Sequence, residues 1–201
     1  MTTDQELVSY ALSLEKRVER LKTLEDVGGV SGSMTFITSQ ELAVASASIT
    51  FTNISQAYDD LFIIYRCRTA RAFGQDYLVA QFNGDTTGGN YDTARQANNS
   101  VNTCLKDIGY VVIGIVLGAT AVNSDDFGVG LCLIPQYTNT TQKLTTQSIG
   151  GADRQTAVFG LNGQCVGSWN QYNAVTSIKF YSSNAANLLA DTKIELYGLT
   201  R

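Results

Sequence analysis

Residues 60–69 read Asp-Leu-Phe-Ile-Ile-Tyr-Arg-Cys-Arg-Thr, and this segment has the strongest strand pattern in the chain. Successive side chains of an extended strand point to opposite faces of a sheet. One face of this strand would therefore carry Leu61, Ile63, Tyr65 and Cys67. The other face would carry Phe62, Ile64, Arg66 and Arg68. The segment predicts a β-strand, and we take it as the reference for the rest of the chain.

The same period of two recurs along most of the sequence after residue 46, with no helical run between the segments. Such spacing predicts an antiparallel β-sandwich over residues 47–201. We expect a jelly roll, with an immunoglobulin-type sandwich as the alternative, although the Cys…Trp…Cys spacing of the latter is missing. The polar segment from Ala94 to Leu105 has no clear pattern. The predicted strands are Met34–Ile37, Ser48–Phe51, Asp60–Thr69, Tyr77–Phe82, Tyr110–Leu117, Phe127–Ile134, Lys143–Ile149, Ala157–Leu161, Gln164–Trp169, Val175–Tyr181 and Lys193–Leu199.

A loop rich in turn-forming residues follows the strand that ends at Phe82. Its Asn83-Gly84 dipeptide predicts a tight turn, because Asn tolerates and Gly readily adopts positive φ. The carboxylate of Asp85 is placed to accept hydrogen bonds from the amides that follow it, as in an Asx turn. Asn90 and Tyr91 complete the loop. We expect this loop to hold a single conformation.

Composition narrows the classes of function. The 201 residues carry a net charge of −4, and only 16% are charged, so the chain has no basic surface for nucleic acid. Histidine is absent, which removes the usual general base and the usual metal ligand. The adjacent pairs Asp59-Asp60 and Asp125-Asp126 would point to opposite faces of an extended chain. We therefore predict no enzyme activity, no cofactor and no metal, with a two-carboxylate carbohydrate hydrolase as a remote alternative.

The four cysteines form no Cys-x-x-Cys pair, so a zinc knuckle is not expected. Cys67 and Cys132 fall inside predicted strands, where a free thiol packs as a small apolar group. The alternative is a set of disulfides that would also use Cys104 and Cys165. The apolar run Val111–Leu117 is too short to cross a bilayer, so we expect no membrane insertion.

The segment Asp4–Glu25 has the one clear helical pattern, and Thr3 with Glu6 fits a capping box before it. Leucines recur every seven residues with small or β-branched residues between them, which predicts a short coiled coil over residues 1–29. An amphipathic helix packed on its own domain is the alternative. Residues 30–46 are expected to be a connector. The predicted oligomerisation residues are Leu7, Ala11, Leu14, Val18 and Leu21.

Trp169, the single tryptophan, lies in a stretch rich in amide side chains. Exposed aromatic rings beside amides suit sugar recognition, since the ring stacks on C–H faces and the amides bind hydroxyls. The alternative is that Trp169 closes one end of the sandwich, because Trp is highly buried on average. A calcium site at Asp85, Asn90 and Asp92 is a weaker alternative to the self-bonded turn. The candidate ligand-binding residues are Trp169, Tyr172, Asn170, Tyr91, Asn90 and Asp85.

Four pieces of the sequence, in order, resemble a family of tailed-bacteriophage virion proteins with fibre-like or decoration-like β domains. They cover residues 46–199, and the Asn-Gly-Asp…Asn-Tyr loop is the most specific of them. The pieces are Tyr58–Arg66, Phe82–Tyr91, the Trp169 turn with Val175–Ile178, and Leu196–Leu199. The resemblance implies a trimeric protein of the virion with a structural or adhesive role, and it brings no catalytic residues.

Two functions follow as expectations. The first is a trimeric tail-fibre-like adhesin, anchored to other virion proteins through its N-terminal helix and presenting loops to host-surface glycans. The second is a purely structural protein, such as a capsid decoration or head fibre.

Overall fold

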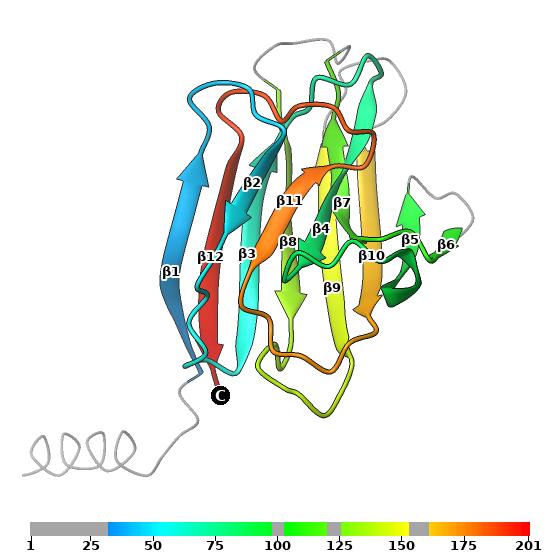
Figure 1. Ribbon diagram of the computed structural model, residues 1–201. Helices are drawn as coiled ribbons and strands as arrows, with labels where there is room; N and C mark the ends of the chain where they lie inside the picture. Colours follow the sequence, from blue (N-terminus) through cyan, green and yellow to red (C-terminus); the bar gives the residue numbers. More distant parts are fainter. Residues whose placement is uncertain (1–31, 98–102, 120–125, 153–160) are drawn as a thin grey trace, which may run out of the picture. The chain divides into compact units, whose positions relative to one another are not determined.

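The protein is described from a computed structural model that covers residues 32–97, 103–119, 126–152 and 161–201 (Figure 1). The predicted helix Asp4–Glu25, with its heptad leucines, lies outside the described residues. The predicted strand Ala157–Leu161 also lies outside them, except for Leu161 itself. The account that follows concerns the compact unit from Met34 to Thr200.

The described residues are mainly β, as the sequence predicted, with twelve strands and one short 3-10 helix, Gly88–Asn90. Among them, no helix has the length and the apolar character needed to span a bilayer. The strands are β1 (Ser33–Glu41), β2 (Ser48–Phe51), β3 (Asp60–Cys67), β4 (Gln75–Phe82), β5 (Tyr91–Ala97), β6 (Thr103–Lys106), β7 (Val111–Leu117), β8 (Gly128–Ile134), β9 (Leu144–Ala152), β10 (Leu161–Trp169), β11 (Ile178–Ser182) and β12 (Lys193–Thr200).

The strands form two sheets. The larger has eight strands in the order β1-β12-β3-β8-β9-β10-β5-β6, and the smaller has four in the order β2-β11-β4-β7. Every pair of neighbouring strands whose register is defined is antiparallel. Figure 1 shows the smaller sheet lying across one face of the larger one.

The main hydrophobic cluster of the described residues includes side chains from both sheets, and two smaller clusters accompany it. In β3 the inward residues Leu61, Ile63, Tyr65 and Cys67 are buried while Arg66 is exposed, so the alternation read from the sequence is confirmed. Strand β7 is buried along its whole length, which explains its continuous apolar sequence. The same cluster contains residues of the smaller sheet, such as Phe180 of β11. The two sheets are therefore joined by shared apolar packing.

Two strands depart from the sequence-based expectation, and a third is longer than predicted. Strand β1 contains the predicted strand Met34–Ile37, and it lies at the edge of the larger sheet beside β12. Strands β5 and β6 arise from the region around Ala94–Leu105 that had no clear pattern. The side chains described in β6 are mostly exposed, and Thr93 is a buried residue of β5. These strands therefore lack the apolar alternation by which a strand is recognised.

All four cysteines are free thiols in this structure, and Cys67 and Cys132 lie inside strands β3 and β8, as predicted. Cys67, Cys132 and Cys165 are buried, and Cys104 is exposed. Burial raises the pKa of Cys67 to about 12 and that of Cys165 to about 11. These buried thiols therefore stay protonated at neutral pH and pack as small apolar groups.

Tyr65 occupies space that three glycines leave open. The side chain is 1% exposed, and a Cβ at Gly114, Gly130 or Gly150 would overlap its ring or hydroxyl. These glycines belong to β7, β8 and β9, so one tyrosine depends on three strands and on both sheets. Its hydroxyl has no hydrogen-bond partner among the described residues. Burial raises the pKa of Tyr65 far above its usual value, so the group stays neutral.

Gly114→Ala should lower the free energy of unfolding by about 1–3 kcal/mol, because the new methyl group overlaps the buried Tyr65 hydroxyl. Adding Tyr65→Phe removes that hydroxyl and should recover much of the loss. Urea denaturation of the wild type, both single variants and the double variant gives the coupling free energy between positions 65 and 114. Gly89→Ala is the control, since a Cβ there meets only Asp107 Oδ1 at 3.7 Å. Additive effects of the two changes would contradict the packing described.

Candidate functional site

The loop after β4 begins with the turn that the sequence predicted. Asn83 has φ of 52° and Gly84 has φ of 70°, and the Asp85 amide donates to the Phe82 carbonyl at 2.9 Å. The turn starts the crossing from β4 in the smaller sheet to β5 in the larger one. It is therefore a corner between sheets, and the prediction of a tight Asn-Gly turn is confirmed.

The side chain of Asn83 fastens this corner to the segment before β11. Its amide nitrogen donates to the Ala174 carbonyl at 2.8 Å. Its Oδ1 accepts from the backbone amides of Thr176 at 2.8 Å and Ser177 at 3.0 Å. One amide side chain thus satisfies three backbone groups of a segment some ninety positions away.

Asp85 is the acceptor at the centre of the loop. Its Oδ1 accepts the Thr87 amide at 2.9 Å, as an Asx turn requires. Its Oδ2 accepts both Asn90 Nδ2 at 2.8 Å and the indole Nε1 of Trp169 at 2.7 Å. Partial burial alone would raise the pKa of Asp85, but the bonds from Trp169, Thr87 and Asn90 outweigh it and lower the pKa.

Three aromatic rings pack behind this carboxylate. Trp169 lies with its ring centroid 5.6 Å from Phe82 and 6.4 Å from Tyr91. The Tyr91 hydroxyl donates to the Asp85 carbonyl at 3.0 Å and accepts from the Phe82 amide at 3.0 Å. Trp169 is 2% exposed, and Tyr91 is completely buried. The rings and their polar ends are therefore satisfied inside the protein.

This geometry corrects part of the predicted ligand site. The rings of Trp169 and Tyr91 are buried, so they offer no face for a sugar, and the alternative that Trp169 closes one end of the β domain describes its position. The calcium alternative also fails at Asp85, because N–H donors point at both of its oxygens. No group of three or more His, Cys, Asp or Glu side chains suited to a metal occurs in the described residues.

The other predicted residues lie around the same corner. Asn90 is half-buried and donates to Asp85, while the backbone amide of Asn170 donates to the Asn90 carbonyl at 2.7 Å. Asn170 Nδ2 donates to Asp92 Oδ2 at 3.1 Å. Tyr172, two residues further on, is 54% exposed. Of the aromatic candidates, Tyr172 is thus the one with a ring open to a ligand.

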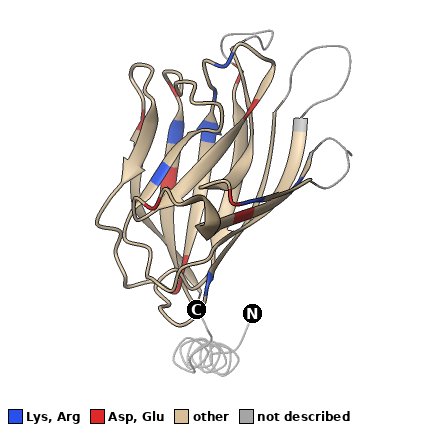
Figure 2. Ribbon diagram, turned by 45° about the vertical axis from the view of Figure 1, so that its right-hand side comes forward, with Lys and Arg blue, Asp and Glu red and all other residues tan. Residues whose placement is uncertain are grey.

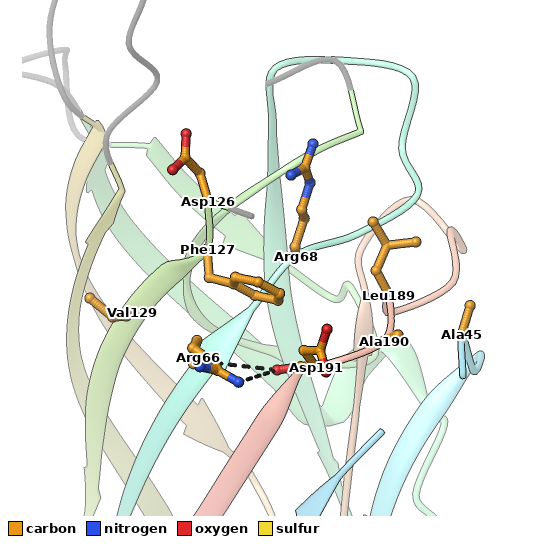
Figure 3. A pocket seen from close by; sticks show the side chains of 9 residues that line it. All are labelled: Ala45, Arg66, Arg68, Asp126, Phe127, Val129, Leu189, Ala190 and Asp191. Atoms are coloured by element: carbon orange, nitrogen blue, oxygen red, sulfur yellow. Dashed lines mark hydrogen bonds between the residues drawn. The ribbon is translucent and has the colours of Figure 1, made fainter. Parts of the chain in front are cut away.

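A pocket that sequence reasoning missed lies beyond the ends of β3 and β12 (Figure 3). Its volume is about 790 Å³, and it includes two arginines from consecutive outward positions of the β3 segment. In the sequence, the only sign of this pocket is that Arg66 and Arg68 fall on the same face of one strand. The remaining lining residues come from segments far apart in the sequence. It is lined by Ala45, Arg66, Arg68, Asp126, Phe127, Val129, Leu189, Ala190 and Asp191.

Both arginines of this pocket are engaged, whereas the buried Asp126 Oδ2 has no hydrogen-bond partner among the described residues. The Arg66 guanidinium lies over the Phe127 ring, 5.0 Å from its centroid, and donates to the Asp191 carbonyl from Nη2 at 3.0 Å. Arg68 is 4% exposed and donates from Nη2 to the Ala119 carbonyl at 3.3 Å. Two arginines and two aspartates balance in charge, so the pocket has no strong bias toward an anion or a cation.

No protein-family model matches the chain, and no curated protein matches it.

The protein should lose stability at low pH, in part because the Asp85 carboxylate becomes protonated. The pKa of Asp85 is lower in the folded state than in the unfolded state. The ionised carboxylate therefore adds its full share to the free energy of unfolding above the unfolded-state pKa. That share is lost as the pH falls through the folded-state pKa. Melting temperatures measured from about pH 5 down to pH 2 should fall less steeply for Asp85→Asn than for the wild type. Asp92→Asn, which removes one bond from Asn170, is the matched control. Parallel curves for wild type and Asp85→Asn would contradict this role.

Substitutions at Gly84 should destabilise the protein in the order Val, Ala, Asn, with Val worst. A Cβ at Gly84 meets nothing within 4 Å, so the cost comes from the positive φ and should be about 1–2 kcal/mol for a non-glycine residue. Asn tolerates this conformation best. Chemical denaturation measures the series, and a Gly84→Val protein as stable as the parent would refute the turn as a constraint.

Proposed function

We propose that this chain is a structural subunit of a bacteriophage virion, built on a jelly roll and assembled as a parallel homotrimer. The observation that carries the proposal is the order of strands in the two sheets. The resemblance of residues 46–199 to fibre-like and decoration-like virion proteins gives the setting.

The strand order supports a jelly roll once four strands are set aside. Without β1, β12, β9 and β10, eight strands remain in chain order: β2, β3, β4, β5, β6, β7, β8 and β11. The smaller sheet then holds the first, last, third and sixth of them, and the larger holds the second, seventh, fourth and fifth. This is the arrangement of an eight-stranded jelly roll with two Greek keys. In this reading β9 and β10 are inserted between the seventh and fourth strands.

The buried polar networks support a structural role over an adhesive one. Both carboxylate oxygens of Asp85 accept hydrogen bonds from groups of the protein itself. Asp76 in β4 is fully buried and accepts from Thr69 Oγ1 at 2.8 Å, Ser182 Oγ at 2.6 Å and Asn184 Nδ2 at 2.7 Å. Such networks fix the loops in one arrangement, which suits a subunit that must fit an assembly.

The parallel trimer rests on the sequence of the N-terminal segment, which is outside the described residues. Its strict heptad repeat is too short to form a stable isolated helix, so it needs partners. Three parallel copies would also provide a symmetric segment by which the protein docks on other virion proteins.

A glycan-binding adhesin remains the second candidate, and one observation favours it. Tyr172 is 54% exposed next to the exposed Asn173, so a ring and an amide are open to solvent on one loop. This is the combination that sugar recognition uses.

The full chain should sediment as a trimer at micromolar concentration, and Leu14→Lys should shift it to monomers because a charge would enter the heptad seam. Sedimentation equilibrium measures both. Purified particles of the phage that encodes the chain should contain it in a copy number divisible by three, measured by quantitative mass spectrometry. A monomeric wild type would refute the trimer, and its absence from particles would refute the virion role.

A glycan array separates the two candidates. Binding that is lost in Tyr172→Ala, with unchanged Trp169 emission as evidence of folding, would favour the adhesin. Asn187→Ala, at an exposed site on another loop, is the control for unspecific effects. A blank array with the full chain supports the structural role.

A further inference from the structure

The outer face of the larger sheet is unusually apolar. In an antiparallel sheet with one face on a core, the other face is ordinarily polar. Here many outward positions of six neighbouring strands carry large apolar side chains, a surface we call the apolar sheet face, and the same face also carries Arg66, Gln147, Gln164, Lys193 and Glu195. Its apolar residues are Phe36, Phe62, Ile64, Val129, Leu131, Leu133, Ile149, Val166 and Tyr197.

The registers of the strands align these side chains in rows. Tyr197 lies opposite Phe62, which lies opposite Leu133, and Phe36 contacts Tyr197 at a centroid distance of 5.6 Å. In the next row, Ile64 lies opposite Leu131, and Leu131 lies opposite Ile149. Side chains in such rows lie about 5 Å apart and touch. Seven of the residues therefore form two rows across the sheet, while Val129 lies opposite Arg66 and Val166 lies opposite Gln147.

The patch is open to solvent in the single chain. Val129, Ile149 and Val166 are 55%, 52% and 53% exposed, values far from those of a core. Six strands spaced by about 4.8 Å and two to three outward rows spaced by about 7 Å give a planar area on the order of 400–500 Å². The largest apolar patch on a typical monomer has about this size and often has a function.

Charge points to a neutral partner. Beside the patch, Arg66 pairs with Glu41 at 3.2 Å and Lys193 pairs with Glu195 at 2.6 Å, so both signs are balanced within the chain. Figure 2 shows Lys or Arg segments next to Asp or Glu segments on neighbouring strands, so both signs of charge occur together. A largely apolar surface whose charged side chains pair with one another suits another copy of this chain better than a strongly charged protein, membrane or nucleic acid.

Among the described residues, no further strand pairs with the edge next to the patch. Strand β1 ends the sheet with nine residues, most of them exposed, and contains no Lys or Pro. Natural edge strands are usually blocked by such residues when nothing covers them. Its exposed Met34 and Phe36 extend the apolar surface up to this edge.

We propose that the apolar sheet face packs against another copy of this chain. The inference rests on the proposed oligomer and names the surface that its β domains share. The heptad segment ends at Glu25 and β1 begins at Ser33, so the chain between them spans at most about 30 Å. Parallel helices would thus hold the β1 strands of different copies close together. The helices would give the β domains a high effective concentration, so a modest apolar contact is enough to hold the domains together.

The test uses the full chain with Val129→Lys and Ile149→Lys combined, because these two side chains are more than half exposed and tolerate a charge in the monomer. Val166→Lys is an independent variant on the same face. Val44→Lys is the matched control, since Val44 is 74% exposed and lies outside the patch. Circular dichroism and Trp169 emission check that each variant folds. Sedimentation equilibrium then measures the dissociation constant.

We expect at least tenfold weaker association for both face variants and no change for Val44→Lys. If Leu14→Lys abolishes association while the face variants associate like the wild type, the helices alone hold the oligomer and this inference is wrong. The proposed trimer would survive that result. A monomeric wild type would overturn both. If the wild type is monomeric and only its binding to virion particles is lost in the face variants, the partner is a different virion protein and the inference is again wrong.

Discussion

The hydrogen bond from the Trp169 indole to the Asp85 carboxylate is the constraint on which one end of the domain depends. It joins the last residue of β10 to the loop that carries the chain from the smaller sheet to the larger one. A buried indole N–H without an acceptor is costly, and so is a carboxylate without donors. The two groups therefore require each other, and the aromatic packing of Phe82 and Tyr91 follows from their positions.

Strand β4 is held by a carboxylate near each end. Asp76 collects hydroxyl and amide donors near its start, and Asp85 does so just after its finish. This use of charge fits a composition in which only 16% of residues are charged. Asp76 and Asp85 accept hydrogen bonds from groups inside the protein. The chain as a whole is rich in the uncharged polar residues Thr, Ser, Asn and Gln.

How much the sequence predicts depends on the range of the interaction. Alternation gave most strands, and Asn83-Gly84-Asp85 gave the turn, because both are local patterns. Trp169 was ambiguous, since its amide neighbours suggested exposure while its partner Asp85 lies 84 positions earlier. Strand β6 was missed because a strand with exposed side chains needs no apolar alternation. The pocket around Arg66 joins four distant segments, so no local pattern predicts it.

The space shared by Tyr65 and its three glycines has a consequence for how this sequence can diverge. A larger residue at Gly114, Gly130 or Gly150 is tolerated only if position 65 shrinks, and a shrinking of position 65 opens a void that those positions can then fill. Four sites on four different strands should therefore change together among descendants of this chain. Drift at any of them is slow, because each single step passes through a poorly packed intermediate.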